Sequence, residues 1–186
     1  HYAANSQETN RLDIDERITK RALEEIFLPG FCACVKEGGT KTIMNAYNKI
    51  NGARCTENKW LLQDKLRDDF GFDGMVMSDW GAALDPAKAL DGGTDLAMPG
   101  PANPKAIYEA VKNGEVSEEV LDRACKRILS VYSWILEHYR KEEVDALPIE
   151  AVLEKTDAAA YDAACEGIVL LKNDGSCPLA KQTKLA

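Results

Sequence analysis

The segment from Gly71 to Gly81, GFDGMVMSDWG, constrains the fold of this chain more than any other. Its apolar run Met75–Met77 stands between a glycine and polar residues, the pattern of a strand buried on both faces in a parallel sheet. Asp79 and Trp80 follow at the carboxyl end of this strand. That end of the strands carries the chemistry in a (β/α)8 barrel, so the pair is a candidate site. In isolation, Asp79 would more simply cap the next helix and Trp80 would fill the core.

Short apolar segments alternate with amphipathic ones along the first three quarters of the chain. This α/β pattern favours a parallel sheet. Three strand-helix units are visible, whereas a closed barrel needs eight, and three strands alone would leave apolar sheet edges unpaired. We therefore expect the chain to be part of a larger barrel. The predicted strands span 41–47, 74–78 and 92–100, and the predicted helices span 15–28, 31–37, 57–70, 82–90, 104–113 and 117–139.

The last quarter of the chain changes character. Residues 140–154 begin with a charged stretch and contain a proline, as a linker does. An alanine-rich helix over 155–167 and a buried strand over 168–173 are predicted to follow. We interpret residues 155–186 as the beginning of a second domain.

Charge and hydropathy exclude several partners. The chain has 186 residues, 45% of them hydrophobic, and a net charge of −8. This acidic balance argues against nucleic acid and anionic membranes as partners. No apolar run approaches the length of a membrane span. The chain starts at His1 rather than at a methionine, so we expect a piece of a longer protein, and its oligomeric state stays open.

The cysteines and histidines do not form a recognisable metal motif. No Cys-x-x-Cys pair occurs, and the two histidines, His1 and His138, lie far apart. We therefore expect no metal, no organic cofactor and no Cys-His protease. Unpaired thiols slightly favour a reducing, cytoplasmic location. The six cysteines are Cys32, Cys34, Cys55, Cys125, Cys165 and Cys177.

Taken together, the motifs resemble family 3 glycoside hydrolases of the β-glucosidase type, over essentially the whole chain. The matching segments are HYAAN at 1–5, MNAYNKING at 44–52, GFDG…SDWGA at 71–82, GTDLAMPG at 93–100 and EGIVLLKN at 166–173. The resemblance implies that residues 1–139 form the C-terminal part of a TIM-type (β/α)8 catalytic barrel. It also implies that residues 155–186 start an α/β-sandwich domain, with 140–154 as the linker.

The resemblance also assigns roles. The family is retaining, so one carboxylate acts as nucleophile and another as acid and then base. By resemblance Asp79 is the nucleophile, Trp80 walls the sugar pocket and Tyr47 donates a hydrogen bond beside Asp79. Met44 would give an apolar contact and His1 would bind sugar hydroxyls. Alternatively, Tyr47 and Met44 are ordinary core residues and His1 is a loose chain end.

Several parts of the family pattern have no counterpart here. A lysine would precede His1, a sugar-clamping aspartate and arginine would lie upstream, and the acid/base glutamate would lie beyond Ala186. We name no acid/base, and we expect the chain alone to be inactive because positioning contributes much of the rate. Glu8 and Arg11 are expected to form a structural ion pair, and Asp95 to shape the last strand.

The predicted activity is removal of terminal β-D-glucosyl residues from a β-glucoside or oligosaccharide. A β-xylosidase or N-acetylglucosaminidase is an alternative, although the His-bearing loop of the latter has no match here. A non-catalytic or split-barrel piece that needs a partner chain is a second alternative. A barrel isomerase or aldolase would need a phosphate-binding glycine loop after the last strands, whereas Gly92 and Gly93 precede the strand. The aglycone and linkage stay open.

Overall fold

The structure, a computed structural model, describes residues 1–100, 103–140, 146 and 148–181. The chain divides into two compact units, His1–His138 and Tyr139–Ala186. None of the described helices has the length and apolarity that crossing a membrane requires.

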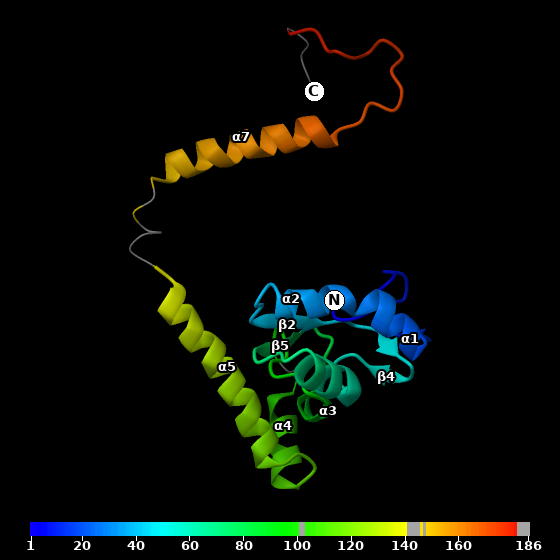
Figure 1. Ribbon diagram of the computed structural model, residues 1–186, viewed down its shortest axis with the longest axis vertical. Helices are drawn as coiled ribbons and strands as arrows, with labels where there is room; N and C mark the ends of the chain where they lie inside the picture. Colours follow the sequence, from blue (N-terminus) through cyan, green and yellow to red (C-terminus); the bar gives the residue numbers. More distant parts are fainter. Residues whose placement is uncertain (101–102, 141–145, 147, 182–186) are drawn as a thin grey trace. The chain divides into compact units, whose positions relative to one another are not determined.

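Four segments lie side by side in parallel in the first unit: Tyr2, strand β2 (Thr42–Asn45), strand β5 (Met75–Ser78) and Leu96. We call them the parallel arc, and Figure 1 labels its two strands, β2 and β5. Strand β2 pairs in parallel with β5, residue for residue over four positions. Parallel bridges join Tyr2 to Asn45 on one side and Met77 to Leu96 on the other. The described chain thus places Tyr2, β2, β5 and Leu96 side by side. The predicted α/β pattern and the strands at 41–47 and 74–78 are confirmed.

The third predicted strand, 92–100, is wrong in extent. Helix α3 (Pro86–Gly92) continues to Gly92, and Gly93 ends it with a left-handed backbone (φ 117°). Only Leu96 then makes a bridge to the sheet. The glycine pair therefore closes a helix, a common use of glycine, and leaves little chain for a strand.

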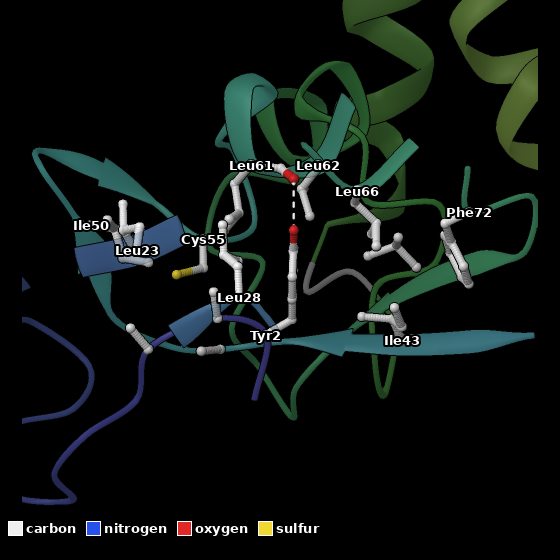
Figure 2. Close-up of a cluster of buried hydrophobic side chains, with 14 residues drawn as sticks. Tyr2, Leu23, Leu28, Ile43, Ile50, Cys55, Leu61, Leu62, Leu66 and Phe72 are labelled. Carbon is white, nitrogen blue, oxygen red and sulfur yellow. Dashed lines mark hydrogen bonds between the residues drawn. The ribbon is translucent and has the colours of Figure 1, made fainter. Parts of the chain in front are cut away.

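Side-chain alternation along the strands separates two faces. Ile43 and Val76 point into the main apolar cluster, which the N-terminal helices and the helix before β5 also line. Figure 2 shows Tyr2 within this cluster, its hydroxyl donating to the carbonyl oxygen of Leu61 at 3.1 Å. The labelled members are Tyr2, Leu23, Leu28, Ile43, Ile50, Cys55, Leu61, Leu62, Leu66 and Phe72.

The predicted helix over 15–28 begins later than expected. Asp15–Glu16 form strand β1, which pairs in parallel with β3 (Lys49–Ile50), and β3 pairs with the antiparallel β4 (Ala53–Arg54). Thr19 caps the helix, since its hydroxyl accepts from the amide of Ala22 at 3.2 Å. Asp15 and Glu16 therefore belong to a strand, and the predicted helix starts only after Thr19.

The remaining helices of the first unit follow the predicted pattern with shifted ends. The helix predicted over 31–37 begins two residues earlier, at Pro29, which occupies the first position of α2, where its missing N–H costs nothing. A second apolar cluster, Leu90, Ala110, Val116 and Ala124, joins the last three helices. The helices are α1 (Lys20–Ala22), η1 (Leu23–Phe27), α2 (Pro29–Lys36), η2 (Trp60–Asp69), α3, α4 (Pro104–Lys112) and α5 (Glu118–His138).

A buried ion cluster fastens β5 to its surroundings. The carboxylate of Asp95 accepts hydrogen bonds from Arg67 Nη2 at 2.7 Å, Arg127 Nη1 at 3.0 Å and the Val76 amide at 2.8 Å. Only 2% of the Asp95 side chain is exposed. Burial lowers the pKa of Arg67 to about 10, which leaves the guanidinium charged at neutral pH. Asp95 therefore ties helices η2 and α5 to the strand that precedes Asp79.

The second unit contains helix α7 (Ile149–Gly167), which starts inside the predicted linker. Residues 141–145 and 147 of that linker lie outside the described part of the chain. The predicted strand over 168–173 is wrong: these residues are exposed and make no strand pairing within the described chain. A strand needs a partner to form, and the described part of this unit offers none. The assignment of 155–186 to a sandwich domain stays a prediction.

Candidate active site

The carboxyl end of the parallel arc gathers four of the five predicted site residues. Asp79 directly follows Ser78, the last residue of β5, and Tyr47 lies two residues beyond the end of β2. Neighbouring parallel strands end at the same edge of a sheet, so their following residues meet. His1 reaches Asp79 from the neighbouring N-terminal segment.

Asp79 is a carboxylate held by donors on both oxygens. His1 Nε2 is hydrogen-bonded to Asp79 Oδ2, and the backbone amide of Trp80 donates to Oδ1 at 2.6 Å. The Asp79 side chain is 16% exposed, so it stays open to a ligand. Helix α3 is capped by Asp85 instead, whose side chain accepts from the amide of Lys88. The alternative in which Asp79 caps the next helix is therefore wrong.

The hydrogen bonds of Asn5 settle the tautomer of His1. Asn5 Nδ2 lies 2.8 Å from His1 Nδ1 and donates to Glu8 Oε1 at 2.9 Å. An amide nitrogen only donates, so Nδ1 accepts, and the proton of a neutral imidazole sits on Nε2. This assignment makes His1 a donor to the Asp79 carboxylate.

A basic and aromatic layer continues from this pair. Arg11 bonds Glu8 at 2.5 Å, as expected, and its guanidinium carbon lies 4.4 Å from the centroid of the Tyr47 ring. The Tyr47 hydroxyl donates to the carbonyl oxygen of Trp80 at 3.0 Å. Burial, followed by the nearby Asp79 carboxylate, raises the pKa of Tyr47. Tyr47 therefore stays a protonated donor beside Asp79.

Trp80 is 64% exposed and lines an open cavity of about 280 Å³ with Leu12, Tyr47, Arg54 and Leu84 among others. The alternative in which Trp80 fills the core is therefore wrong. Met44 lies apart from this cavity. It is half-buried on β2 and shares another hollow, of about 220 Å³, with His1 and Phe31.

The backbone around Asp79 is braced by the neighbouring loop. The buried Ser78 hydroxyl donates to the Asp79 carbonyl oxygen at 2.8 Å and accepts from the Met98 amide at 2.9 Å. The Gly81 amide donates to the Met98 carbonyl oxygen at 2.8 Å. Sequence reasoning missed Ser78 and Asn5 as site residues. Their only signal was position, beside Asp79 and within the HYAAN motif.

No group of three His, Cys, Asp or Glu side chains that could hold a metal ion occurs in the described residues. The side chains around Asp79 are instead hydrogen-bond donors and aromatic rings. They suit a neutral, hydroxyl-rich ligand.

Comparison with known proteins decides the family. The family described as the glycosyl hydrolase family 3 N terminal domain matches residues 1–131. The chain belongs to glycosyl hydrolase family 3. An exo-alpha-(1->6)-L-arabinopyranosidase of Bifidobacterium longum is 43% identical over 94% of the chain, and the thermostable beta-glucosidase B of Acetivibrio thermocellus is 41% identical over all of it.

Solved family 3 structures share the fold of the chain. Beta-glucosidase 3B of Thermotoga neapolitana, in complex with glucose, matches 97% of the chain with a TM-score of 0.78 and 42% identity. A Kluyveromyces marxianus beta-glucosidase in complex with glucose matches 98% with a TM-score of 0.81 and 31% identity. The chain spans only about a quarter of these relatives, between 22% and 26% of their length.

Proposed function

We propose that this chain carries the nucleophile of a retaining exo-β-glycosidase of the β-glucosidase type. One observation supports it above all: the Asp79 carboxylate stands at the end of β5, between the His1 donor and the exposed Trp80 indole. An ionised, oriented carboxylate beside an aromatic surface is what a glycosyl-enzyme intermediate requires.

In this proposal Asp79 attacks the anomeric carbon while the bond to the leaving oxygen breaks. A general acid protonates that oxygen, and the sugar is left as an ester of Asp79. Water, deprotonated by the same group acting as base, then attacks the anomeric carbon and releases Asp79. The product keeps the β configuration after the two inversions. By resemblance the acid/base is a glutamate of the second domain beyond Ala186, so we expect the chain alone to be inactive.

The other site residues would bind and orient the sugar. The hydrogen bond from His1 Nε2 orients the Asp79 carboxylate, and the His1 ring would reach a sugar hydroxyl. Trp80 offers an exposed apolar face, and Tyr47 is held by its bond to the Trp80 carbonyl oxygen. Met44 would contribute an apolar contact beside His1 in the second hollow.

The sugar itself has a second candidate. One relative is named an arabinopyranosidase, and others are named beta-glucosidases. An α-L-arabinopyranoside shares with a β-D-glucopyranoside the equatorial leaving group and the equatorial hydroxyls at C2 and C3. It differs at C4 and lacks the hydroxymethyl group. A β-xyloside lacks only the hydroxymethyl group and stays a third candidate.

The test compares aryl β-glucoside, α-L-arabinopyranoside and β-xyloside hydrolysis by this chain and by the chain extended at both ends to the length of its relatives. We expect activity only in the extended form, with the ratio of kcat/KM values identifying the sugar. A 2-deoxy-2-fluoroglycoside of that sugar should label Asp79. Labelling of another residue would overturn the assignment, and activity in the short form would show that an acid/base lies within these residues. No hydrolysis of any of the three in the extended form would favour a non-catalytic piece.

A further inference from the structure

We propose that Ser78 is a positioning residue that sets the orientation of Asp79 for nucleophilic attack. The inference rests on the proposed function, because it needs Asp79 to be the nucleophile. It adds a residue that does not line the cavity beside Trp80. Two hydrogen bonds through one buried hydroxyl support it, together with a third bond between the same two loops.

The Ser78 hydroxyl uses its donor and one acceptor site in fixed directions. It donates to the Asp79 carbonyl oxygen at 2.8 Å and accepts from the Met98 amide at 2.9 Å. Ser78 is 1% exposed, so water does not compete for either bond. Within β5, alternate residues share a face, which places Ser78 on the same face of the strand as the buried Val76.

A second tie lies on the other side of Asp79. The Gly81 amide donates to the Met98 carbonyl oxygen at 2.8 Å, and Gly81 has a left-handed backbone (φ 76°). The backbone of Met98 therefore bonds the chain both before and after Asp79. The peptide that carries the nucleophile is held at two points, with Ser78 supplying the only side chain in this pair of links.

Attack at an anomeric carbon depends on this orientation. The carboxylate must approach in line with the leaving group, and a displacement of about 1 Å can cost roughly 100-fold in rate. Removing the Ser78 hydroxyl frees the Asp79 carbonyl and leaves the Met98 amide without its acceptor. The expected consequence is slower formation of the glycosyl-enzyme with an unchanged sugar pocket.

The decisive variant is Ser78→Ala, made in the extended chain, with Ser78→Thr as the rescue that keeps a hydroxyl. Thr94→Val is the matched control. The Thr94 hydroxyl is also buried and bridges two groups, since it accepts from Asn45 Nδ2 and donates to the Thr56 carbonyl oxygen, both at 2.7 Å. It makes no bond to Asp79 or Met98. Each variant is measured for thermal unfolding, glucose affinity and the rate of labelling by the 2-deoxy-2-fluoroglycoside.

We expect Ser78→Ala to slow labelling by about 10- to 100-fold, to leave the glucose dissociation constant within about twofold, and to keep the label on Asp79. Ser78→Thr should recover most of the rate. Thr94→Val should lower Tm at least as much without slowing labelling. Equal labelling rates in Ser78→Ala and Thr94→Val would overturn the inference. A label on another residue in the unchanged protein would instead overturn the proposed function.

Discussion

Two aspartates of the same parallel arc, Asp79 and Asp95, have opposite surroundings. Asp95 is 2% exposed in its side chain and accepts from two guanidinium groups and one amide. Asp79 is 16% exposed and accepts from one imidazole and one amide. The first carboxylate is enclosed by permanent charges, whereas the second is oriented and left accessible.

This difference separates a carboxylate that holds a fold from one that can react. The Asp95 side chain is almost fully enclosed, and its loss would leave the buried Arg67 and the part-buried Arg127 without this counter-charge. Asp79 keeps a face toward solvent, and its donors stabilise the anion without covering it. The residue type is the same at both positions. The two aspartates differ in the number and kind of their hydrogen-bond donors.

The sharpest test of the contrast is Asp79→Asn. In the extended chain we expect glycoside hydrolysis to fall by roughly 10⁴-fold or more, because an amide is a poor nucleophile. The amide oxygen still accepts from Trp80 and only the bond from His1 is lost, so thermal unfolding should change far less than in a variant of Asp95. Hydrolysis kinetics and calorimetry measure the two effects. A large loss of stability with residual activity would erase the contrast with Asp95.

The complementary variant, Asp95→Asn, should act on stability. Removing one member of a buried ion cluster costs about 3–5 kcal/mol of unfolding free energy. The matched control is Asp73→Asn, whose carboxylate pairs with Lys41 at 3.2 Å with a 76% exposed side chain, and which should cost under about 1 kcal/mol. Urea unfolding of this chain measures both, and equal losses would contradict the structural role of Asp95.

A third test concerns the buried thiol of Cys55, an acidic group that burial keeps protonated. Burial raises the pKa of the Cys55 thiol from 9.0 to about 12. Between these values the unfolded chain loses a proton that the folded chain retains, so stability falls as pH rises. The expected slope is about 1.4 kcal/mol per pH unit from this thiol. Cys55→Ala should remove that slope, whereas the exposed Cys34→Ala should keep it. Urea titrations at rising pH measure this dependence. An equal fall of the unfolding free energy with pH in Cys55→Ala and Cys34→Ala would refute the prediction.

The smallest effect is expected for Tyr47→Phe. Losing the hydroxyl that donates to the Trp80 carbonyl oxygen should cost about 0.5–1.5 kcal/mol of unfolding free energy. Tyr108→Phe, at a 64% exposed ring, should stay within about 0.5 kcal/mol of zero. Chemical denaturation separates the two. An unchanged stability in Tyr47→Phe would mean that the Trp80 loop is held without this bond.

The strongly periodic parts of the fold could be predicted from sequence, and the locally ambiguous ones could not. The apolar runs around Ile43 and Val76 predicted both paired strands correctly. Asp15 and Glu16 suit a helix start equally well, and only the distant strand β3 makes them a strand. The apolar segment after Gly167 was predicted as a strand, but pairing depends on a neighbour that the described residues lack.

For the candidate site, the sequence motifs identified the side chains that would bind a sugar. His1, Tyr47, Asp79 and Trp80 do lie together. The supporting contacts could not be predicted, because they depend on where the two partners lie in the folded chain. Asn5 reaches the ring of His1, and the Ser78 hydroxyl reaches the Met98 amide. A single sequence carries no signal for either bond.

The brace at Met98 has a consequence for how this site can be studied. Two of its three hydrogen bonds use the amide and the carbonyl of Met98, which every residue except proline supplies in full. Substitutions of Met98 by residues other than proline would therefore keep these two hydrogen bonds. A saturation library at position 98 would not reveal how much they contribute. Replacing the Met98 amide by an ester through semisynthesis would delete the donor alone. Two of the three hydrogen bonds in this brace are thus beyond the reach of side-chain substitution at position 98, except to proline.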